Sequence, residues 1–289
     1  MKTGLVLEGG AMRGMFTAGV LDVLMENGVR FDSLIGVSAG AVFGCNYKSG
    51  QIGRTIRYNM RFCKDKQYCS FRSLLKTGDL YGAEYCYHTL PRELDVFDNA
   101  AFRQNPMSFF ILCTDVETGQ AIIHECHTCD DNDLEWMRAS ASMPLAANIV
   151  EIDGYKLLDG GIADSIPLRR FENMGYEKNV VILTQPRGYV KKPNKLMPLL
   201  RRVFRKYPRL VDTLSHRHEN YNAATAYVAR QEHAGHALVI RPEAPLGIGH
   251  VCHDAAEMKR VYELGRRIGE QRLSEIQAFL ASNLSVRYP

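Results

Sequence analysis

Ser38 stands in the sequence Gly36-Val37-Ser38-Ala39-Gly40, a Gly-x-Ser-x-Gly pattern that can present a catalytic serine. Its position matters more than its letters, because it lies between an expected strand over Phe31–Val37 and an expected helix over Ala39–Tyr47. A nucleophilic serine needs such a sharp turn with small neighbours, a need that Gly36 and Gly40 meet. The pattern predicts a serine nucleophile; a structural turn with a capping serine is the alternative.

A glycine-rich turn, Glu8-Gly9-Gly10-Ala11-Met12-Arg13-Gly14, follows the first expected strand, Thr3–Leu7. Exposed backbone N–H groups at a strand-to-helix turn bind anions. In acyl transfer this turn would be the oxyanion hole, where each donor contributes about 3 kcal/mol of transition-state stabilisation. Arg13 would add positive charge or pin the loop.

The same turn allows a dinucleotide-binding interpretation. Gly9-x-Ala11-x-x-Gly14 is one substitution from that fingerprint, and Asp32 lies close to the expected place of a ribose-binding acid. That interpretation assigns no role to the end of the next strand, where Ser38 follows. Two motifs at adjacent strand ends that serve one reaction favour acyl transfer.

A third motif, Asp159-Gly160-Gly161, follows the expected strand Tyr155–Leu158. Asp-Gly alone is a common turn. The three motifs in this order, over roughly residues 3–185, resemble the patatin-like phospholipase family, particularly its small bacterial members. The segments Thr17–Leu21 and Ala139–Pro144 are also similar to that family.

The resemblance implies a three-layer α/β/α sandwich with a mostly parallel central sheet, and a lipid acyl-ester hydrolase without metal or cofactor. It implies Ser38 as nucleophile and Asp159 as base, without a histidine. The implied oxyanion hole comprises Gly9, Gly10, Ala11, Arg13 and Gly14. Ala11 stands where the family usually has a third glycine, and its methyl group could narrow the approach.

A Ser–Asp dyad is chemically sound, because a serine hydroxyl needs a base within hydrogen-bond reach. A carboxylate held away from water has a raised pKa and accepts a proton more readily. It could return that proton to the leaving alkoxide.

Two alternatives stay open. In a Ser-Asp-His hydrolase the third residue would be one of the histidines after Asp159, namely His216, His218, His233, His236, His250 and His253. That fold places its serine after several strands, whereas Ser38 follows the second. A catalytically silent lipid-binding protein on the same fold is the other alternative, for which Ala11 is the only hint.

Two segments raise other functions. His124-x-Cys126-His127-x-Cys129 has four potential metal ligands but no second, separated pair, so no metal site is expected. Lys191–Arg209 lies in a stretch, Arg187–Arg209, with nine basic residues and no acidic one, and its apolar residues could rest on an anionic membrane. A solvated basic face explains the charge equally well, and no motif supports nucleic-acid binding.

The elements that must position these residues alternate between strands and helices, which favours a parallel sheet covered by helices. Further strands are expected at 108–114, 121–125, 149–152, 155–158, 179–184 and 237–241, with helices at 12–27 and 255–280 and a loop at 76–82. We expect a patatin-like catalytic domain over residues 1–185. We expect residues 186–289 to form a basic, mainly helical C-terminal region that packs on or completes the core.

Composition agrees with a globular protein of 289 residues, of which 46% are hydrophobic and 24% charged. The first residues, Met1–Glu8, read as a strand rather than a signal peptide. The eight cysteines form no compact disulfide framework and are expected to be reduced. We therefore expect a cytoplasmic location, with possible peripheral membrane contact through 191–209.

Overall fold

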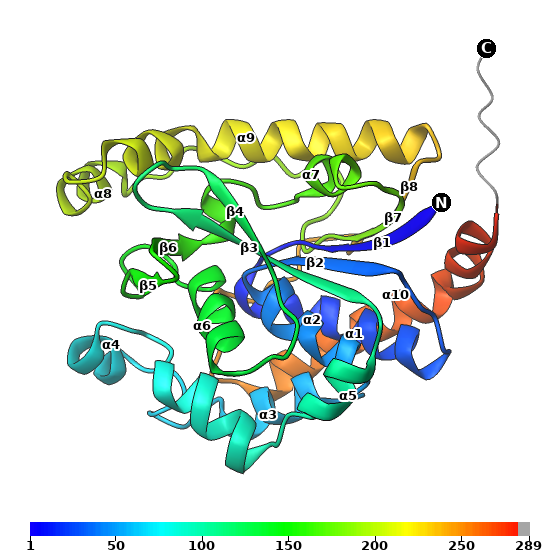
Figure 1. Cartoon of the computed structure of the whole chain (residues 1–289), viewed down its shortest axis with the longest axis horizontal. Helices are drawn as coiled ribbons and strands as arrows, with labels where there is room; N and C mark the ends of the chain where they lie inside the picture. Colours follow the sequence, from blue (N-terminus) through cyan, green and yellow to red (C-terminus); the bar gives the residue numbers. More distant parts are fainter. Residues whose placement is uncertain (283–289) are drawn as a thin grey trace.

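A mixed, mostly parallel sheet of eight strands runs through the middle of the computed structural model, which describes residues 1–282 (Figure 1). The parallel part has the order β3-β2-β1-β7-β8, while β4 and β6 pair antiparallel with β3 and β5 pairs with β6. The strands are β1 (Lys2–Leu7), β2 (Ser33–Val37), β3 (Ser108–Asp115), β4 (Ala121–Glu125), β5 (Val150–Ile152), β6 (Tyr155–Asp159), β7 (Tyr176–Ile182) and β8 (Ala237–Ile240).

Helices cover both faces of this sheet. The α-helices are α1 (Gly14–Glu26), α2 (Ala39–Ser49), α3 (Arg54–Phe62), α4 (Phe71–Thr77), α5 (Asn99–Gln104), α6 (Asp131–Ser140), α7 (Leu168–Asn173), α8 (Met197–Val203), α9 (Pro208–His233) and α10 (Ala255–Ala281). Two short 3-10 turns, η1 (Ala11–Arg13) and η3 (Gly160–Ile162), and a π-helix, η2 (Tyr85–Leu94), complete them.

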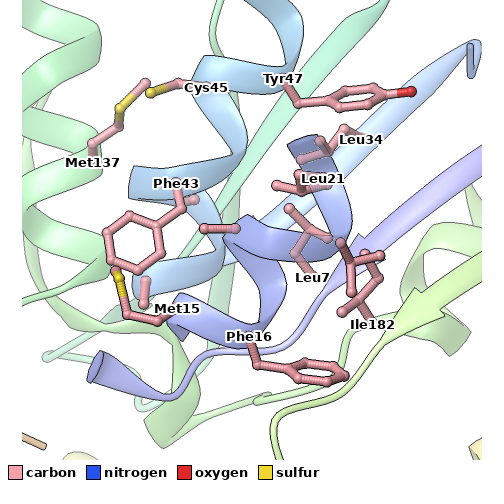
Figure 2. Packing of buried hydrophobic residues seen from close by; sticks show 14 of the residues in the cluster. Leu7, Met15, Phe16, Leu21, Leu34, Phe43, Cys45, Tyr47, Met137 and Ile182 are labelled. Atoms are coloured by element: carbon pink, nitrogen blue, oxygen red, sulfur yellow. The ribbon is translucent and has the colours of Figure 1, made fainter. Parts of the chain in front are cut away.

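The layers follow from which residues are apolar on each face. Helices α1, α2 and α10 lie on one side of the sheet and α7 and α9 on the other (Figure 1). Figure 2 shows the larger core, where Leu7 and Ile182 of the sheet meet Phe16 of α1. All five residues of β2 are buried, as expected for a central parallel strand. The expected fold class is confirmed.

Most expected elements are present, with shifted ends. Strand β7 begins at Tyr176, three residues before the expected start at Asn179, because it pairs with β1 from Lys2 onward. The expected loop at 76–82 is wrong at its start, since α4 extends to Thr77 after the Ser70 side chain caps its first turn. The prolines of the basic segment do not prevent helices, because Pro198 and Pro208 stand in the first turns of α8 and α9.

Helices α1 and α10 cross at two glycines, although their sequences are far apart. A Cβ on Gly19 would lie 2.1 Å from the carbonyl oxygen of Tyr262, and one on Gly265 would lie 2.0 Å from that of Phe16. No other residue type allows the two backbones to approach so closely. The C-terminal helix is thereby fixed against the helix that follows the glycine-rich turn.

Candidate active site

Strands β2 and β6 approach the same edge of β3 from opposite directions. β4 pairs with Phe110–Thr114 of β3, a stretch that overlaps the pairings of both β2 and β6. β4 must therefore occupy one edge, which leaves β2 and β6 to share the other. Val37 lies opposite Leu112 and Asp159 opposite Cys113, so the two strands end beside each other. Ser38 follows the end of one strand, and Asp159 ends the other.

Ser38 occupies a strained backbone turn between β2 and α2. Its φ is +54° and its ψ is −124°, a conformation that residues with a Cβ rarely adopt. Its N–H donates to Ser140 Oγ at 2.8 Å, and Ser140 Oγ donates to the Leu112 carbonyl at 2.7 Å. Close packing leaves no room for a larger neighbour, because a Cβ at Gly40 would lie 2.6 Å from the Leu7 carbonyl oxygen. The surroundings therefore hold the hydroxyl in place.

Asp159 is the hydrogen-bond partner of that hydroxyl. Ser38 Oγ donates to Asp159 Oδ2 at 2.7 Å, and the Gly161 N–H donates to Asp159 Oδ1 at 2.7 Å. The backbone of Asp159 is also anchored, since its N–H donates to the Ser142 carbonyl and its own carbonyl accepts from Thr114 Oγ1. Burial raises the pKa of the Asp159 carboxyl, opposed mainly by the positive charge of Arg217.

The glycine-rich turn passes directly beside Ser38. A Cβ at Gly9 would lie 3.0 Å from Ser38 Cβ, so only glycine lets the turn approach this closely. The N–H groups of Arg13 and Gly14 are used within the turn itself. Those of Gly9, Gly10 and Ala11 have no acceptor among residues 1–282. The turn thus offers three backbone donors near the serine, fewer than the five residues of the expected hole.

Ala11 adopts the left-handed conformation that a third glycine would take without strain. Its φ is +47°, and the residue lines two cavities that both reach Ser38. The left-handed region costs a residue with a Cβ about 1–2 kcal/mol. The backbone nevertheless reaches the conformation, so the substitution leaves the Ala11 N–H in the turn.

Glu8, which begins the turn, is a buried carboxylate with two donors. Thr184 N–H donates to Glu8 Oε2 at 2.5 Å, and the Tyr221 hydroxyl donates to Glu8 Oε1 at 2.7 Å. Burial raises the pKa of the Glu8 carboxyl. These bonds tie the end of β1 to the end of β7 and to α9.

Two cavities meet at Ser38. The first has a volume of about 130 Å³ and is lined mainly by apolar and aromatic side chains, among them Val42, Phe43, Leu90 and Met137. The π-helix η2 contributes Cys86, Tyr87, Leu90 and Pro91 to its wall. The second cavity has a volume of about 310 Å³ and contains Asp159, Arg13, Lys191, Arg217 and His250. One side of the serine is therefore apolar and the other is charged.

Histidine does not take part in the Ser38–Asp159 contact. Within residues 1–282, no histidine forms a hydrogen bond with either residue. His250 lines the polar cavity, where its Nε2 lies 3.3 Å from Arg13 Nη1. The other five histidines considered as triad members, at 216, 218, 233, 236 and 253, line neither cavity. The geometry favours the dyad over a Ser-Asp-His triad.

The dinucleotide interpretation fails on the position of Asp32. Asp32 precedes β2, and its Oδ2 accepts from the Thr3 N–H and hydroxyl at the start of β1. The glycine-rich turn follows the opposite end of β1. An acid at the wrong end of the strands cannot hold a ribose beside that turn.

The histidine–cysteine segment has a structural role. His124 Nε2 bonds to Asp133 Oδ1 at 2.7 Å, and its ring stacks on Trp136. In the described part of the chain no cluster of three or more histidine, cysteine, aspartate or glutamate side chains could hold a metal ion. The same residues include no helix that is long and apolar enough to cross a membrane.

The basic segment divides into a buried and an exposed part. Lys191 reaches the polar cavity, whereas Leu196, Leu199 and Val203 of the following stretch are each about half exposed, at 53%, 46% and 52%. Two further exposed apolar side chains, Phe71 and Leu75, lie on α4. Figure 1 places α4 and α8 at the same end of the molecule.

Several residues of the site escaped prediction from sequence. Ser140 and Ser142 support Ser38 and Asp159, and their only signal was the likeness of Ala139–Pro144 to the family. Arg217 and Tyr221 come from α9, where nothing in the residue pattern distinguishes them from surface positions. Their role depends on how α9 packs.

Comparison with known proteins supports the motifs. Residues 5–171 match the family described as Patatin-like phospholipase, and residues 207–281 match a domain of unknown function, DUF6363. The chain is 27% identical over 287 residues to the uncharacterized protein YjjU of Escherichia coli, covering 96% of this chain and 79% of YjjU.

More distant relatives share only part of their length. The neuropathy target esterase sws of Drosophila melanogaster is 28% identical over 177 residues, which is 60% of this chain and 12% of that protein. The patatin-like phospholipase domain-containing protein ZK370.4 of Caenorhabditis elegans is 27% identical, over 60% of this chain and 13% of its own. The structure of VipD from Legionella pneumophila aligns with a TM-score of 0.46 and 13% identity, over 95% of this chain and 67% of VipD.

Proposed function

Because this chain belongs to the patatin-like phospholipase family, we propose that it is a serine hydrolase that cleaves acyl esters of lipids with Ser38 and Asp159. The observation that carries the proposal is the 2.7 Å hydrogen bond from Ser38 Oγ to Asp159 Oδ2. That pair is buried, and it lies where an apolar and a polar cavity meet. Residues 1–185 would supply the catalytic part, and residues 186–289 would complete the polar cavity.

In the first step, Ser38 Oγ attacks the carbonyl carbon of the ester while its proton passes to Asp159 Oδ2. The carbonyl oxygen gains negative charge, which the N–H groups of Gly9, Gly10 and Ala11 would stabilise. When the tetrahedral intermediate collapses, the C–O bond to the alcohol breaks. Asp159 then returns its proton to the leaving alkoxide, and the acyl group stays on Ser38.

In the second step, water attacks the acyl-Ser38 carbonyl and Asp159 takes a proton from that water. Collapse of the second intermediate releases the carboxylic acid and restores the serine hydroxyl with the proton from Asp159. The raised pKa of the Asp159 carboxyl supports this role, because a carboxylate buried away from water is a stronger base than a solvated one.

The apolar cavity would hold the acyl chain. Its wall combines aliphatic and aromatic side chains from α2, η2 and α6, which match a hydrocarbon chain and offer few polar partners. The alcohol part of the ester would occupy the polar cavity on the other side of Ser38.

Labelling with a fluorophosphonate tests the proposal. The wild type should be labelled at Ser38, Ser38→Ala should not, and Asp159→Asn should react at least about 100-fold more slowly, the typical contribution of a general base. Ser142→Ala is the matched control, because its hydroxyl bonds to the Arg138 carbonyl and not to the dyad. An unlabelled, folded wild type would support the silent lipid-binding alternative and overturn the hydrolase.

Membrane contact is a separate part of the proposal. Leu196, Leu199 and Val203 are exposed within the basic stretch, an arrangement that supports binding to an anionic lipid surface. Cosedimentation with vesicles should be stronger for phosphatidylglycerol than for phosphatidylcholine and should fall in Leu199→Asp. Val96→Asp is the control, because Val96 is exposed but lies outside this stretch. Equal binding to both vesicles would refute the contact.

A further inference from the structure

Three cationic side chains line the polar cavity beside Ser38. Arg13 comes from the glycine-rich turn, Lys191 from the segment after β7, and Arg217 from α9. None of the three forms an ion pair with a carboxylate among residues 1–282. Unpaired cations gathered from three separate segments in one cavity are costly unless an anion joins them.

Lys191 is held so that its side chain reaches inward. Its backbone N–H donates to Asn222 Oδ1 at 2.8 Å, and its carbonyl accepts from Asn222 Nδ2 at 3.0 Å. Its ammonium group lies 4.5 Å from the centre of the Tyr221 ring. The neighbouring Lys192 and Lys195 are exposed to solvent instead.

The two arginines leave donors unused. Arg217 Nε donates to the Gly161 carbonyl at 2.6 Å, which orients the guanidinium beside the Asp159 turn and leaves its terminal nitrogens available. Arg13 Nε is buried and has no hydrogen-bond partner in the described part of the chain. His250 lies against Arg13, and burial together with Arg13, Arg217 and Lys191 lowers its pKa, so it is neutral at pH 7.

Carboxylates balance only part of this charge. Glu8 and Asp159 also line the cavity, but the oxygens of Glu8 accept from Thr184 and Tyr221, and those of Asp159 accept from Ser38 and Gly161. Three cations therefore face two carboxylates, which leaves an excess of one positive charge in the cavity. Arg13 Nε and the terminal nitrogens of Arg217 remain donors without an acceptor in the described part of the chain.

We infer that this cavity binds the phosphate of the alcohol part of the substrate, so that the chain selects acyl esters with a phosphate close to the scissile ester. Three donors from different directions suit a phosphate, which has three strong acceptor oxygens, better than a carboxylate. The inference rests on the proposed hydrolase for its catalytic consequence. The anion site itself does not depend on it.

The C-terminal region, whose match is to a domain of unknown function, thereby gains a role. Arg217, Tyr221, Asn222 and His250 all lie within residues 207–281. Arg217 supplies one cation, and the Tyr221 ring lies against the Lys191 ammonium group. Asn222 bonds to the Lys191 backbone, and His250 contacts Arg13. This region would select the head group, while the first part of the chain performs the chemistry.

Direct binding tests the site without catalysis. Calorimetry with Ser38→Ala should detect glycerol 3-phosphate but not glycerol. Adding Lys191→Gln should weaken that binding by about tenfold or more, the usual loss for one charge-assisted hydrogen bond. Adding Lys192→Gln instead should leave it unchanged. No binding of glycerol 3-phosphate would overturn the inference, and so would inorganic phosphate binding as tightly, because the site would then serve free phosphate.

Kinetics test the selectivity. With hexanoyl esters of glycerol 3-phosphate and of glycerol, the wild type should have a kcat/KM at least about tenfold higher for the phosphate ester. Lys191→Gln should lower this ratio toward one, mainly through KM, and Lys191→Arg should restore much of it. Equal kcat/KM values in a wild type that is labelled by fluorophosphonate would overturn the inference and leave the hydrolase standing. A wild type that binds glycerol 3-phosphate but is not labelled by fluorophosphonate would overturn the hydrolase and leave the phosphate site standing.

Discussion

At the scale of single residues, the site depends on a carboxylate whose basicity is set by burial. Burial of Asp159 raises the pKa of its carboxyl, and Arg217, Ser38, the Gly161 N–H and Lys191 oppose that rise. A general base works only when ionised, so its pKa determines where activity fails in acid.

The pH profile should reflect this carboxylate. For the neutral glycerol ester, kcat/KM should fall as pH decreases through a pKa above the ordinary aspartate value of about 4. Arg217→Gln should move this acid limb to higher pH, because the guanidinium lowers the pKa of Asp159. Arg209→Gln, on the exposed start of the same helix, should not. Full activity down to about pH 4 would contradict the assignment of Asp159 as base.

Ala11→Gly should stabilise the protein. The substitution relieves a left-handed alanine at a cost in chain entropy, so the free energy of unfolding should rise by about 0.5–1 kcal/mol. Urea unfolding measures the change. Ala256→Gly, in the exposed first turn of α10, should instead lower the free energy of unfolding by about 1 kcal/mol. A fall in Ala11→Gly as large as in the control would show that the turn carries no such strain.

At the scale of elements, the segment after α6 serves the dyad more directly than its sequence indicates. Ser140 accepts the N–H of Ser38, and the Ser142 carbonyl accepts the N–H of Asp159. One short segment therefore holds the ends of β2 and β6 in a fixed position relative to each other. Its position follows from α6, which packs near β3, β5 and β6.

Ser140→Ala should weaken the support that this segment gives to Ser38. It leaves the buried N–H of Ser38 without its acceptor, which costs about 1–3 kcal/mol and loosens the strained turn. Fluorophosphonate labelling should slow by about tenfold, a change that a stopped-flow or gel time course measures. Ser142→Ala keeps its backbone carbonyl and should label at the wild-type rate. Wild-type labelling of Ser140→Ala would exclude the supporting role.

The close crossing of α1 and α10 is a second feature of the elements, and the stability of the protein should depend on it. Gly265→Ala should destabilise the protein by about 2–4 kcal/mol, because its Cβ would overlap the Phe16 carbonyl. Gly269→Ala, one turn later, should cost clearly less, since its Cβ would come no closer than 3.3 Å to any atom, the nearest being Val23 Cβ. Thermal melts of both variants measure the difference. Equal stability of the two would mean that the helices can separate without loss.

At the scale of the whole molecule, the polar cavity exists only because three distant segments meet. The charge of Lys191 is sensitive to this arrangement. Burial, with Arg217 and Arg13 nearby, lowers the Lys191 pKa to about 8, while the carboxylates of Glu8 and Asp159 oppose the shift. His250, neutral at pH 7, and Tyr221 complete the groups that face it.

Binding of a phosphate ester should therefore fail in alkali. As pH rises through about 8, Lys191 loses its proton, and kcat/KM for the phosphate ester should fall. The neutral ester should show no such limb near this pH. Lys191→Arg should remove the limb, because a guanidinium stays protonated throughout this range. A limb shared by both esters would assign it to another group.

Local sequence determined much of the candidate site. The Gly-x-Ser-x-Gly and Asp-Gly-Gly motifs each needed only a strand end and a tight turn, which neighbouring residues specify. Their order also indicated the family and hence the fold class. The glycine-rich turn was located as well, although the hydrogen bonds inside it decide which of its N–H groups remain available.

Only the tertiary structure decided what faces the serine from the other side. Ser38 and Asp159 are 121 positions apart, and the chain between them carries no signal that β2 and β6 end on one edge of β3. Arg217 and Lys191 look like surface cations in the sequence, because a cation that lines a cavity has the same neighbouring residues in sequence as one that is exposed to solvent. Packing of α9 over the strand ends turns them inward, and that packing depends on contacts across the whole chain.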